Sequence, residues 1–210
     1  MGLDGSENKL DLSSAASAPS SLASGSRPAG TETDADILDA VRKGDHREAL
    51  ALCARRHARS VGKLCMALLG SASEADDALQ DTLLAAHASF ATFRGEGSLR
   101  AWLFSIARRR CARVLERRVT QPSVEGRAAD EAPASGSREQ ADALVDARRR
   151  AEAARALLAR VRPSEREALL LRYEAGLSYR EVGEACGVDE ATARKRVSRA
   201  LARLRELVKE

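Results

Sequence analysis

Cationic side chains recur at the helical period near the C-terminal end of the chain. In an α-helix, one side would carry small residues and hydrogen-bond donors: Ala191, Arg194, Lys195, Ser198, Arg199 and Ala202. A guanidinium group can donate two parallel hydrogen bonds to guanine, and any cation attracts phosphate. Because alanine and serine are short, the backbone of such a helix can approach a groove closely. This face indicates a helix that reads DNA.

The other side of this helix is apolar and would pack on preceding helices through Ala193, Val197, Ala200 and Leu204. Arg196 and Arg203 flank the cationic side, where phosphate contacts are favoured over base contacts. A solvated basic helix is the alternative. Residues that start and stop three further helices precede this one in the chain, and that arrangement favours DNA binding.

A second basic helix is expected over residues 98–118, preceded by a loop at 92–97. Its inward stripe is Leu103, Ala107, Cys111 and Val114, and its outward side is Ser105, Arg108, Arg109 and Arg113. Charge alone does not decide between a second DNA surface and an ordinary basic helix end. In the loop, Phe93 could stack on an unpaired base or belong to the core.

An acidic helix is expected over residues 73–90. We expect Ala75, Leu79, Leu83, Ala86 and Phe90 to face inward and Asp77, Gln80, Asp81 and Leu84 to face outward, with Asp76 at the edge. Carboxylates around an exposed leucine suit a protein partner better than DNA, because they supply both steering and an apolar contact. A solvated helix with one exposed leucine explains the same composition, so both readings stay open.

Helix-capping signals divide the first part of the chain into four helices. The first passes through Ile37, Leu38 and Val41 and ends at Gly44. Asp45 and Glu48 form a capping box for a long helix that ends near Gly70. Ser73 and Ser98 are the expected N-caps of the helices that reach about Phe90 and Arg118.

The second part of the chain also carries helix-capping and helix-breaking residues. Its first helix is expected at roughly 142–161 and ends before Pro163. The next helix is expected to begin with a capping box of Ser164 and Glu167 and to end at Gly176. A second capping box, of Ser178 and Glu181, begins a helix that ends at Gly187, and Asp189 caps the last helix. A short helix, a glycine turn and a longer basic helix are typical of a helix-turn-helix.

These elements predict an all-α protein, and an aromatic content of only 3% argues against a large β core. We expect a disordered tail at 1–33, a four-helix domain at 34–118, a flexible linker at 119–140 and a helix-turn-helix domain at 141–210. The tail and linker are inferred from their Ser, Ala, Gly and Pro content.

No catalytic, phosphate-loop or cofactor motif is recognisable, so we expect no enzyme activity, cofactor, metal or small-molecule substrate. No apolar run approaches a membrane span and no signal peptide is evident, which predicts a cytoplasmic protein with reduced thiols. One alternative is a metal- or redox-sensing protein built on Cys53, His57 and Cys65. Buried cysteines beside a histidine are the more ordinary reading.

Three stretches carry a resemblance to a known family. Residues 73–87 (SEADDALQDTLLAAH) and 91–108 (ATFRGEGSLRAWLFSIAR) resemble the second conserved region of extracytoplasmic-function (ECF) sigma factors. Residues 162–188 (RPSEREALLLRYEAGLSYREVGEACGV) resemble the fourth region, and 191–204 (ATARKRVSRALARL) its recognition helix. Both regions, in this order, cover nearly all of the chain outside the tail and linker.

The resemblance implies an alternative sigma factor that directs promoter-specific transcription initiation. Asp76, Asp77, Gln80, Asp81 and Leu84 would bind the β′ clamp of core RNA polymerase. Phe93, Arg94, Ser98, Arg108, Arg109 and Arg113 would open and read the minus-ten element. Thr192, Arg194, Lys195, Ser198 and Arg199 would read the minus-thirty-five element, with Arg196 and Arg203 on phosphates.

Further partners implied by the resemblance are the polymerase β flap and an anti-sigma factor. A stand-alone helix-turn-helix regulator, dimeric on palindromic operators, remains the second alternative. It would leave the acidic helix without a role, and no dimerisation element is evident in the sequence.

Overall fold

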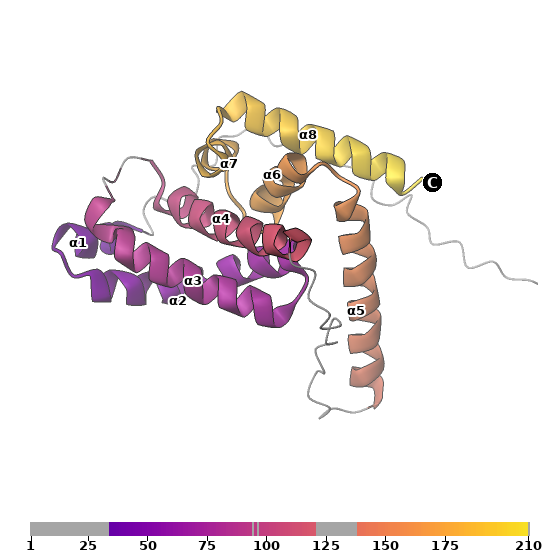
Figure 1. Cartoon of the computed structure of the whole chain (residues 1–210), viewed down its shortest axis with the longest axis horizontal. Coiled ribbons are helices and arrows are strands. Elements are labelled where there is room, and N and C mark those ends of the chain that lie inside the picture. Colours follow the sequence, from indigo (N-terminus) through magenta and orange to yellow (C-terminus); the bar gives the residue numbers. More distant parts are fainter. Residues whose placement is uncertain (1–33, 94, 96, 121–137, 210) are drawn as a thin grey trace, which may run out of the picture.

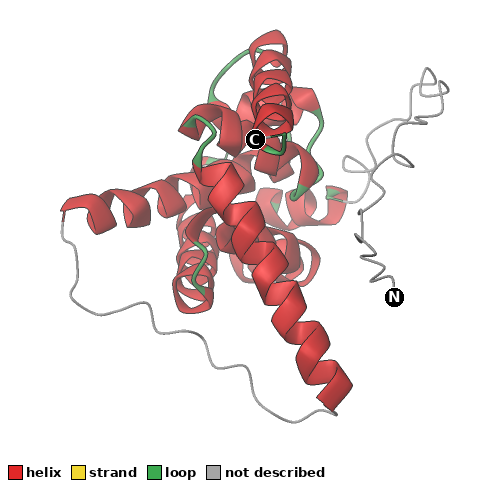
Figure 2. Cartoon of the chain, turned by 90° about the vertical axis from the view of Figure 1, so that its right-hand side faces the viewer, coloured by secondary structure: helices red, strands yellow, loops and turns green. Residues whose placement is uncertain are grey.

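The computed structural model describes residues 34–93, 95, 97–120 and 138–209, and this part of the chain is built of helices and loops without strands (Figures 1 and 2). The elements are α1 (Ala35–Arg42), α2 (His46–Leu69), α3 (Ala72–Ser89), the 3-10 helix η2 (Phe90–Thr92), α4 (Leu99–Thr120), α5 (Arg138–Ala159), α6 (Pro163–Tyr173), α7 (Tyr179–Cys186) and α8 (Glu190–Leu207). The predicted all-α class is confirmed. The predicted tail lies outside the described residues.

Several predicted caps are present. The Asp45 carboxylate accepts from the backbone N–H of Glu48 at 3.0 Å, and the Asp189 carboxylate accepts from that of Thr192 at 2.7 Å. Ser178 and Glu181 form the complete reciprocal capping box of α7. Gly187 ends α7 with φ +68, a left-handed conformation that residues with a Cβ rarely adopt.

Two predicted caps are wrong. Ser71, not Ser73, caps α3: Gly70 has a left-handed conformation, Ser71 after it is extended and accepts from the Glu74 N–H, and the helix begins at Ala72. Helix α6 begins at Pro163, a residue suited to the first helical position, and its N-cap residue is Arg162, which makes no side-chain cap. Because Ser164 lies inside the helix, the predicted box of Ser164 and Glu167 is absent, and Glu167 has another partner, described below.

Both ends of the predicted linker are helical. Helix α4 continues to Thr120, and α5 begins at Arg138 rather than near residue 142. Residues 121–137, the middle of the predicted linker, lie outside the described part of the chain. Figure 1 shows α5 projecting from the body formed by the other helices.

Helices α1 to α4, here called the N-terminal unit, share an apolar core to which all four contribute. Val61 and Leu64 of α2 and Leu103 of α4 are fully buried in it. The predicted inward stripe of α3 is confirmed at Ala75 and Ala86 and in the following Phe90, whereas Leu79 and Leu83 are only half-buried. Ala78 and Thr82 occupy that buried side as well, because α3 packs along a line one residue removed from the predicted one.

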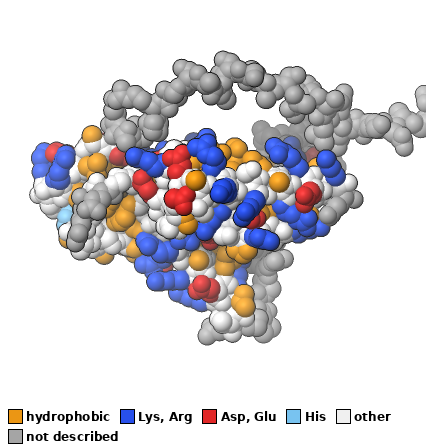
Figure 3. Space-filling view, turned by 90° about the horizontal axis from the view of Figure 1, so that it is seen from above, with side chains coloured by type: hydrophobic (Ala, Val, Ile, Leu, Met, Phe, Trp, Pro, Cys, Tyr) orange, Lys and Arg blue, Asp and Glu red, His pale blue; other side chains and the backbone are white. Residues whose placement is uncertain are grey.

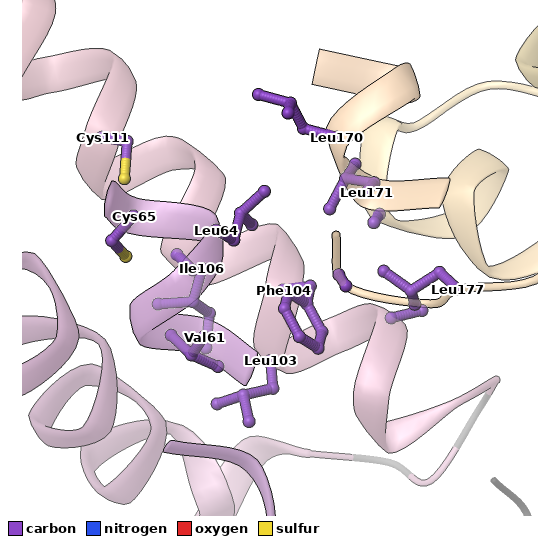
Figure 4. Close-up of a cluster of buried hydrophobic side chains, with 14 of the residues drawn as sticks. Val61, Leu64, Cys65, Leu103, Phe104, Ile106, Cys111, Leu170, Leu171 and Leu177 are labelled. Atoms are coloured by element: carbon purple, nitrogen blue, oxygen red, sulfur yellow. The ribbon is translucent and has the colours of Figure 1, made fainter. Parts of the chain in front are cut away.

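Helices α5 to α8, here called the C-terminal unit, pack against the N-terminal unit. Helix α4 contacts α2 and α3 on one side and α7 on the other, and α2 also contacts α6. Figure 4 shows Leu171 of α6 and Leu177, in the loop before α7, facing Phe104 of α4. All three side chains are fully buried. One continuous apolar cluster therefore joins the two units.

Candidate nucleic-acid interface

The helix-turn-helix formed by α7 and α8 positions the predicted recognition face. Ala193, Val197 and Ala200 are buried on the inner side of α8, as the apolar period predicts, and Leu204 packs partly against the core. Helix α8 contacts both α6 and α7. The opposite side of α8 is therefore left to solvent.

That outer side carries the predicted DNA-binding residues. Arg194, Lys195, Ser198 and Arg199 are exposed, and Thr192, Arg196 and Arg203 are half-buried beside them. Seen from the side on which α8 lies, the molecular surface is rich in Lys and Arg with a few acidic side chains among them (Figure 3). The geometry brings long cationic donors and short side chains together on one convex face, as a groove-binding helix requires.

Arg194 has two neighbours that the periodicity did not identify. Its Nη2 donates to Glu190 Oε1 at 2.7 Å, and its guanidinium carbon lies 4.5 Å from the ring centroid of Tyr179. The guanidinium of Arg172 lies 5.0 Å from the same centroid and donates to the carbonyl oxygen of Leu177 at 2.9 Å. Two guanidinium groups from different helices thus approach the Tyr179 ring, a relation that no spacing rule within one helix reveals.

The predicted protein-docking face on α3 is open. Asp76, Asp77, Gln80 and Asp81 are exposed, and Leu84 is 65% exposed. Asp81 Oδ2 lies 4.0 Å from Arg110 Nη1, with both side chains partly in solvent. Such a pair adds little stability, so these carboxylates remain available to a partner.

Among the predicted minus-ten residues, Phe93 is half-buried and packs on Trp102, with their ring centroids 4.7 Å apart. Arg109 and Arg113 are exposed on α4. Arg94 lies outside the described residues. Phe93 therefore packs on the core through one part of its side chain and leaves another part accessible.

Ser98 and Arg108 are not directed to open solvent, contrary to the outward face predicted for Arg108. The Ser98 hydroxyl donates to Glu181 Oε1 at 2.8 Å, and the Ser98 N–H donates to Glu184 Oε2 at 3.0 Å. Arg108 Nη1 donates to Glu167 Oε2 at 3.1 Å, and the Arg108 side chain is only 24% exposed. Three carboxylates of the C-terminal unit thus hold two predicted DNA-binding residues.

Glu181 is the most buried of these carboxylates and serves both units. Burial raises the pKa of Glu181, but hydrogen bonds from the Ser178 backbone and from the Ser98 and Ser178 hydroxyls lower it, and the net pKa is below the ordinary 4.5. The ionised form is the one that these donors stabilise. A single carboxylate therefore caps α7 and binds the start of α4.

The proposed metal or redox site finds no support in its geometry. Nε2 of the buried His57 lies 2.9 Å from Asp34 Oδ1, and Cys53 is fully buried, which raises its pKa to about 12. Cys65 faces Cys111 across the core (Figure 4). In the described part of the chain, His, Cys, Asp and Glu form no group of three or more suited to a metal ion.

None of the described helices combines the length and the apolar character needed to cross a membrane.

Two family models match the chain, namely sigma-70 region 2 over residues 53–120 and sigma-70 region 4 over residues 151–204. The ECF RNA polymerase sigma factor SigM of Mycobacterium tuberculosis is 31% identical over 176 residues, which are 84% of this chain and 85% of SigM. The ECF RNA polymerase sigma factor EcfG of Rhodopseudomonas palustris is 34% identical over 149 residues, which are 71% of this chain and 79% of EcfG.

Two solved structures share the fold. CnrH, in complex with the cytosolic domain of CnrY, superposes with a TM-score of 0.64 at 20% identity and covers 84% of this chain and 97% of CnrH. The sigma factor RpoE of Bartonella quintana, in complex with the anti-sigma factor NepR, gives a TM-score of 0.55 at 28% identity over 79% of this chain and 97% of RpoE. The chain belongs to the ECF family of RNA polymerase sigma factors, and it is an alternative sigma factor that directs transcription initiation.

Proposed function

We propose that three surfaces of this sigma factor divide the work of promoter-specific initiation. The α3 face binds core RNA polymerase, α4 with its preceding loop opens and reads the minus-ten element, and α8 reads the minus-thirty-five element. The observation that carries this proposal is the presence of an open acidic face on α3 and an open cationic face on α8 in one chain. These faces suit partners of opposite charge.

The assignment of α8 rests on its exposed donors. Arg194 and Arg199 can each donate two hydrogen bonds to a guanine edge in the major groove, and Lys195 can contact bases or phosphates. Arg196 and Arg203 lie half-buried at the edges of this face, where the DNA backbone would pass. Thr192, in the first turn of α8, is bonded to the Asp189 cap and contributes to the contact region at the helix start.

The assignment of α3 rests on an exposed leucine among carboxylates. The carboxylates of Asp76, Asp77 and Asp81 give long-range attraction to a basic surface, and Leu84 gives an apolar contact. The partner proposed for this face is the coiled coil of the polymerase β′ clamp, and we assign the β flap to the C-terminal unit.

The assignment of α4 rests on exposed arginines beside an aromatic pair. Phe93 and Trp102 offer ring faces on which an unpaired base can stack, while Arg109 and Arg113 can bind the phosphates of the separated strand. Ser98 and Arg108 belong to this surface too, once they are released from the C-terminal unit.

The protein acts as a non-catalytic subunit in the cytoplasm, and its activity is controlled by an anti-sigma factor. Support for such a partner comes from the relative RpoE, whose structure was determined with the anti-sigma factor NepR. No cofactor, metal or small-molecule substrate is part of the proposal.

Reconstituted transcription tests these assignments. Purified protein and core polymerase are given a randomised promoter library, and the initiated transcripts are sequenced. We expect enrichment of two sequence blocks near positions minus ten and minus thirty-five. Initiation that does not depend on the added protein, or tight binding of palindromic duplexes by a dimer in the absence of polymerase, would contradict the proposal and favour a stand-alone regulator.

A further inference from the structure

A carboxylate lies at the start of the cationic face of α8. Glu190 is the first residue of α8, and its side chain is 49% exposed. Its Oε1 accepts a hydrogen bond at 2.7 Å from Nη2 of Arg194, which lies one helical turn further along. The phosphates of DNA repel a carboxylate, so Glu190 adds no attraction to a face that binds DNA. Attraction to DNA therefore does not account for Glu190.

Helix capping does not account for Glu190 either, because the neighbouring Asp189 already caps α8. Asp189 Oδ1 accepts from the backbone N–H of Thr192, and Asp189 Oδ2 accepts from the Thr192 hydroxyl, both at 2.7 Å. This carboxylate thus satisfies an N–H of the first turn and places a negative charge at the positive end of the helix dipole. Both of its oxygens are bonded within the fold.

The carboxylate of Glu190 has an oxygen to offer to a ligand. In the described part of the chain, Arg194 is the only side chain that bonds to Glu190, and it bonds to Oε1. Oε2 therefore stays available as an acceptor. Arg194 uses one N–H for Glu190, lies over the ring of Tyr179 at 4.5 Å, and keeps enough N–H groups for two parallel hydrogen bonds to guanine.

The place of Glu190 in the helix-turn-helix is one from which bases are read. The N-terminal residues of the second helix of this motif contact base edges in the major groove. Cytosine presents an amino donor there, and a carboxylate accepts from it. Adenine presents an amino group beside the N7 acceptor, which repels a carboxylate, while guanine and thymine present acceptors. Cytosine is therefore the base that suits Glu190.

Glu190 and Arg194 can reach two neighbouring base pairs at once. The two residues are one turn apart, about 6 Å along the axis of α8, and their side-chain ends meet at 2.7 Å. Successive base pairs of B-form DNA are about 3.4 Å apart. Two side chains whose ends are in contact therefore match two stacked base pairs.

We infer that Glu190 is a specificity-determining residue of this sigma factor. Its carboxylate accepts a hydrogen bond from the amino group of a cytosine in the minus-thirty-five element, in the base pair next to the guanine that Arg194 reads. The inference rests on the function proposed for α8. Glu190 also acts against other sequences, because a base without an amino group at this place leaves a desolvated carboxylate near phosphates without a donor.

The test is selection of minus-thirty-five sequences from a randomised promoter library in the presence of core polymerase. Wild type should enrich two adjacent G·C pairs. Glu190→Ala should lose the preference in one of these pairs and keep it in the other. Glu190→Gln should change the same pair to A·T, because glutamine donates to and accepts from adenine at once. Arg194→Ala should instead lose the preference in the other pair.

The matched control is Glu206→Gln. Glu206 is exposed in the last turn of α8 and accepts a hydrogen bond from Arg203 Nη1 at 3.2 Å. It is therefore also a carboxylate paired with an arginine of the same helix, at the end remote from Glu190. Glu206→Gln makes the same charge change and should leave both G·C pairs enriched.

A second measurement compares the affinities of two labelled duplexes in the presence of core polymerase. One duplex carries the selected sequence, and in the other the pair assigned to Glu190 is replaced by A·T. This replacement should lower the affinity of wild type about tenfold and that of Glu190→Ala less than about twofold. Glu190→Ala should bind the replaced duplex more tightly than wild type does, because a charge that phosphates repel has been removed.

Three outcomes would contradict these expectations. Enrichment of both G·C pairs by Glu190→Ala would overturn the inference. Loss of only the pair that Arg194→Ala also loses would overturn it too, because Glu190 would then act by positioning Arg194. A wild-type protein that enriches no minus-thirty-five sequence would refute the function proposed for α8 and the inference with it, whereas an enriched sequence that does not respond to Glu190 would refute the inference alone.

Discussion

The guanidinium of Arg194 lies over the ring of Tyr179, at 4.5 Å from its centroid, while Arg172 approaches the same ring at 5.0 Å. Tyr179 is the first residue of α7, and Arg194 belongs to the outer face of α8. A cation over an aromatic ring is attracted by the quadrupole of the ring. The contact holds a flexible side chain in one orientation before DNA arrives, together with the bond from Arg194 to Glu190.

Removing the Tyr179 ring should therefore weaken base reading by Arg194. We expect Tyr179→Leu to reduce affinity for the minus-thirty-five element by about 0.5–1 kcal/mol, the usual strength of an exposed cation–π contact, and Tyr179→Phe to retain it. The measurement is binding of a labelled duplex in the presence of core polymerase. In the Arg194→Ala background the same leucine substitution should have little further effect, and fully additive losses would show that Tyr179 does not act through Arg194.

Substitution within the exposed face of α8 should separate base contacts from phosphate contacts. Arg194→Ala and Arg199→Ala should each cost about 1–3 kcal/mol on the preferred element and relax the preference at one or two base positions. Arg203→Ala should weaken binding evenly across sequences. It should also reduce the slope of the logarithm of the binding constant against the logarithm of the salt concentration by about one. Promoter selection that is identical for wild type and Arg194→Ala would contradict base reading by this residue.

Charge reversal on α3 should abolish binding to core polymerase without unfolding the protein. Asp77 and Asp81 are exposed, so Asp77→Lys with Asp81→Lys removes no buried contact. The control is Glu116→Lys on α4, which is also exposed and makes the same kind of charge change. Circular dichroism checks the fold and a pull-down with core enzyme measures binding. Retention of wild-type affinity by the doubly reversed variant would remove the polymerase assignment from this face.

Acid should weaken the cap of α7 and the contact with Ser98 together. The folded-state pKa of Glu181 is below the ordinary 4.5, so the ionised carboxylate stabilises the fold at neutral pH, and this contribution is lost as pH falls below 4.5 toward the folded value. Glu181→Gln should be less stable than wild type at pH 7, by about 1 kcal/mol for a net hydrogen bond. Thermal unfolding between pH 7 and 3 should show the difference shrinking. A difference that is constant with pH would contradict this role.

The thiols should react slowly in the native protein. Cys53, Cys65 and Cys111 are buried and Cys186 is half-buried. Burial raises the pKa of Cys53 to about 12 and raises that of Cys186, so the reactive thiolate is scarce at pH 8. Alkylation followed by mass spectrometry should detect Cys186 first and the other cysteines only after denaturation. Rapid native modification of Cys65 would revive a redox role.

The sequence determined the helices and, for α8, which side is buried and which stays in solvent. Capping residues such as Asp45, Ser178 and Asp189 act on backbone groups three residues away. Because this effect is local, it can be predicted from the sequence. The apolar period of α8 likewise predicted Ala193, Val197 and Ala200 as buried. Family resemblance, rather than periodicity, supplied the roles of the acidic face on α3 and of the minus-ten residues.

Competing local signals account for the errors. Ser73 and Ser164 each stand near a helix start, yet Gly70 and Pro163 move those starts upstream. Both serines satisfy the spacing rule, and only the backbone conformation shows which residue is the cap. The boundaries of a helix therefore stay less certain than its existence.

Only the tertiary structure decided what Ser98 and Arg108 contact. Their partners Glu181, Glu184 and Glu167 lie 83, 86 and 59 positions away along the chain. Helical periodicity assigns a residue to a face but does not say which other helix will cover that face. The packing of Phe104 against Leu171 and Leu177 fixes that choice, because burial of apolar surface between distant segments depends on how the whole chain folds.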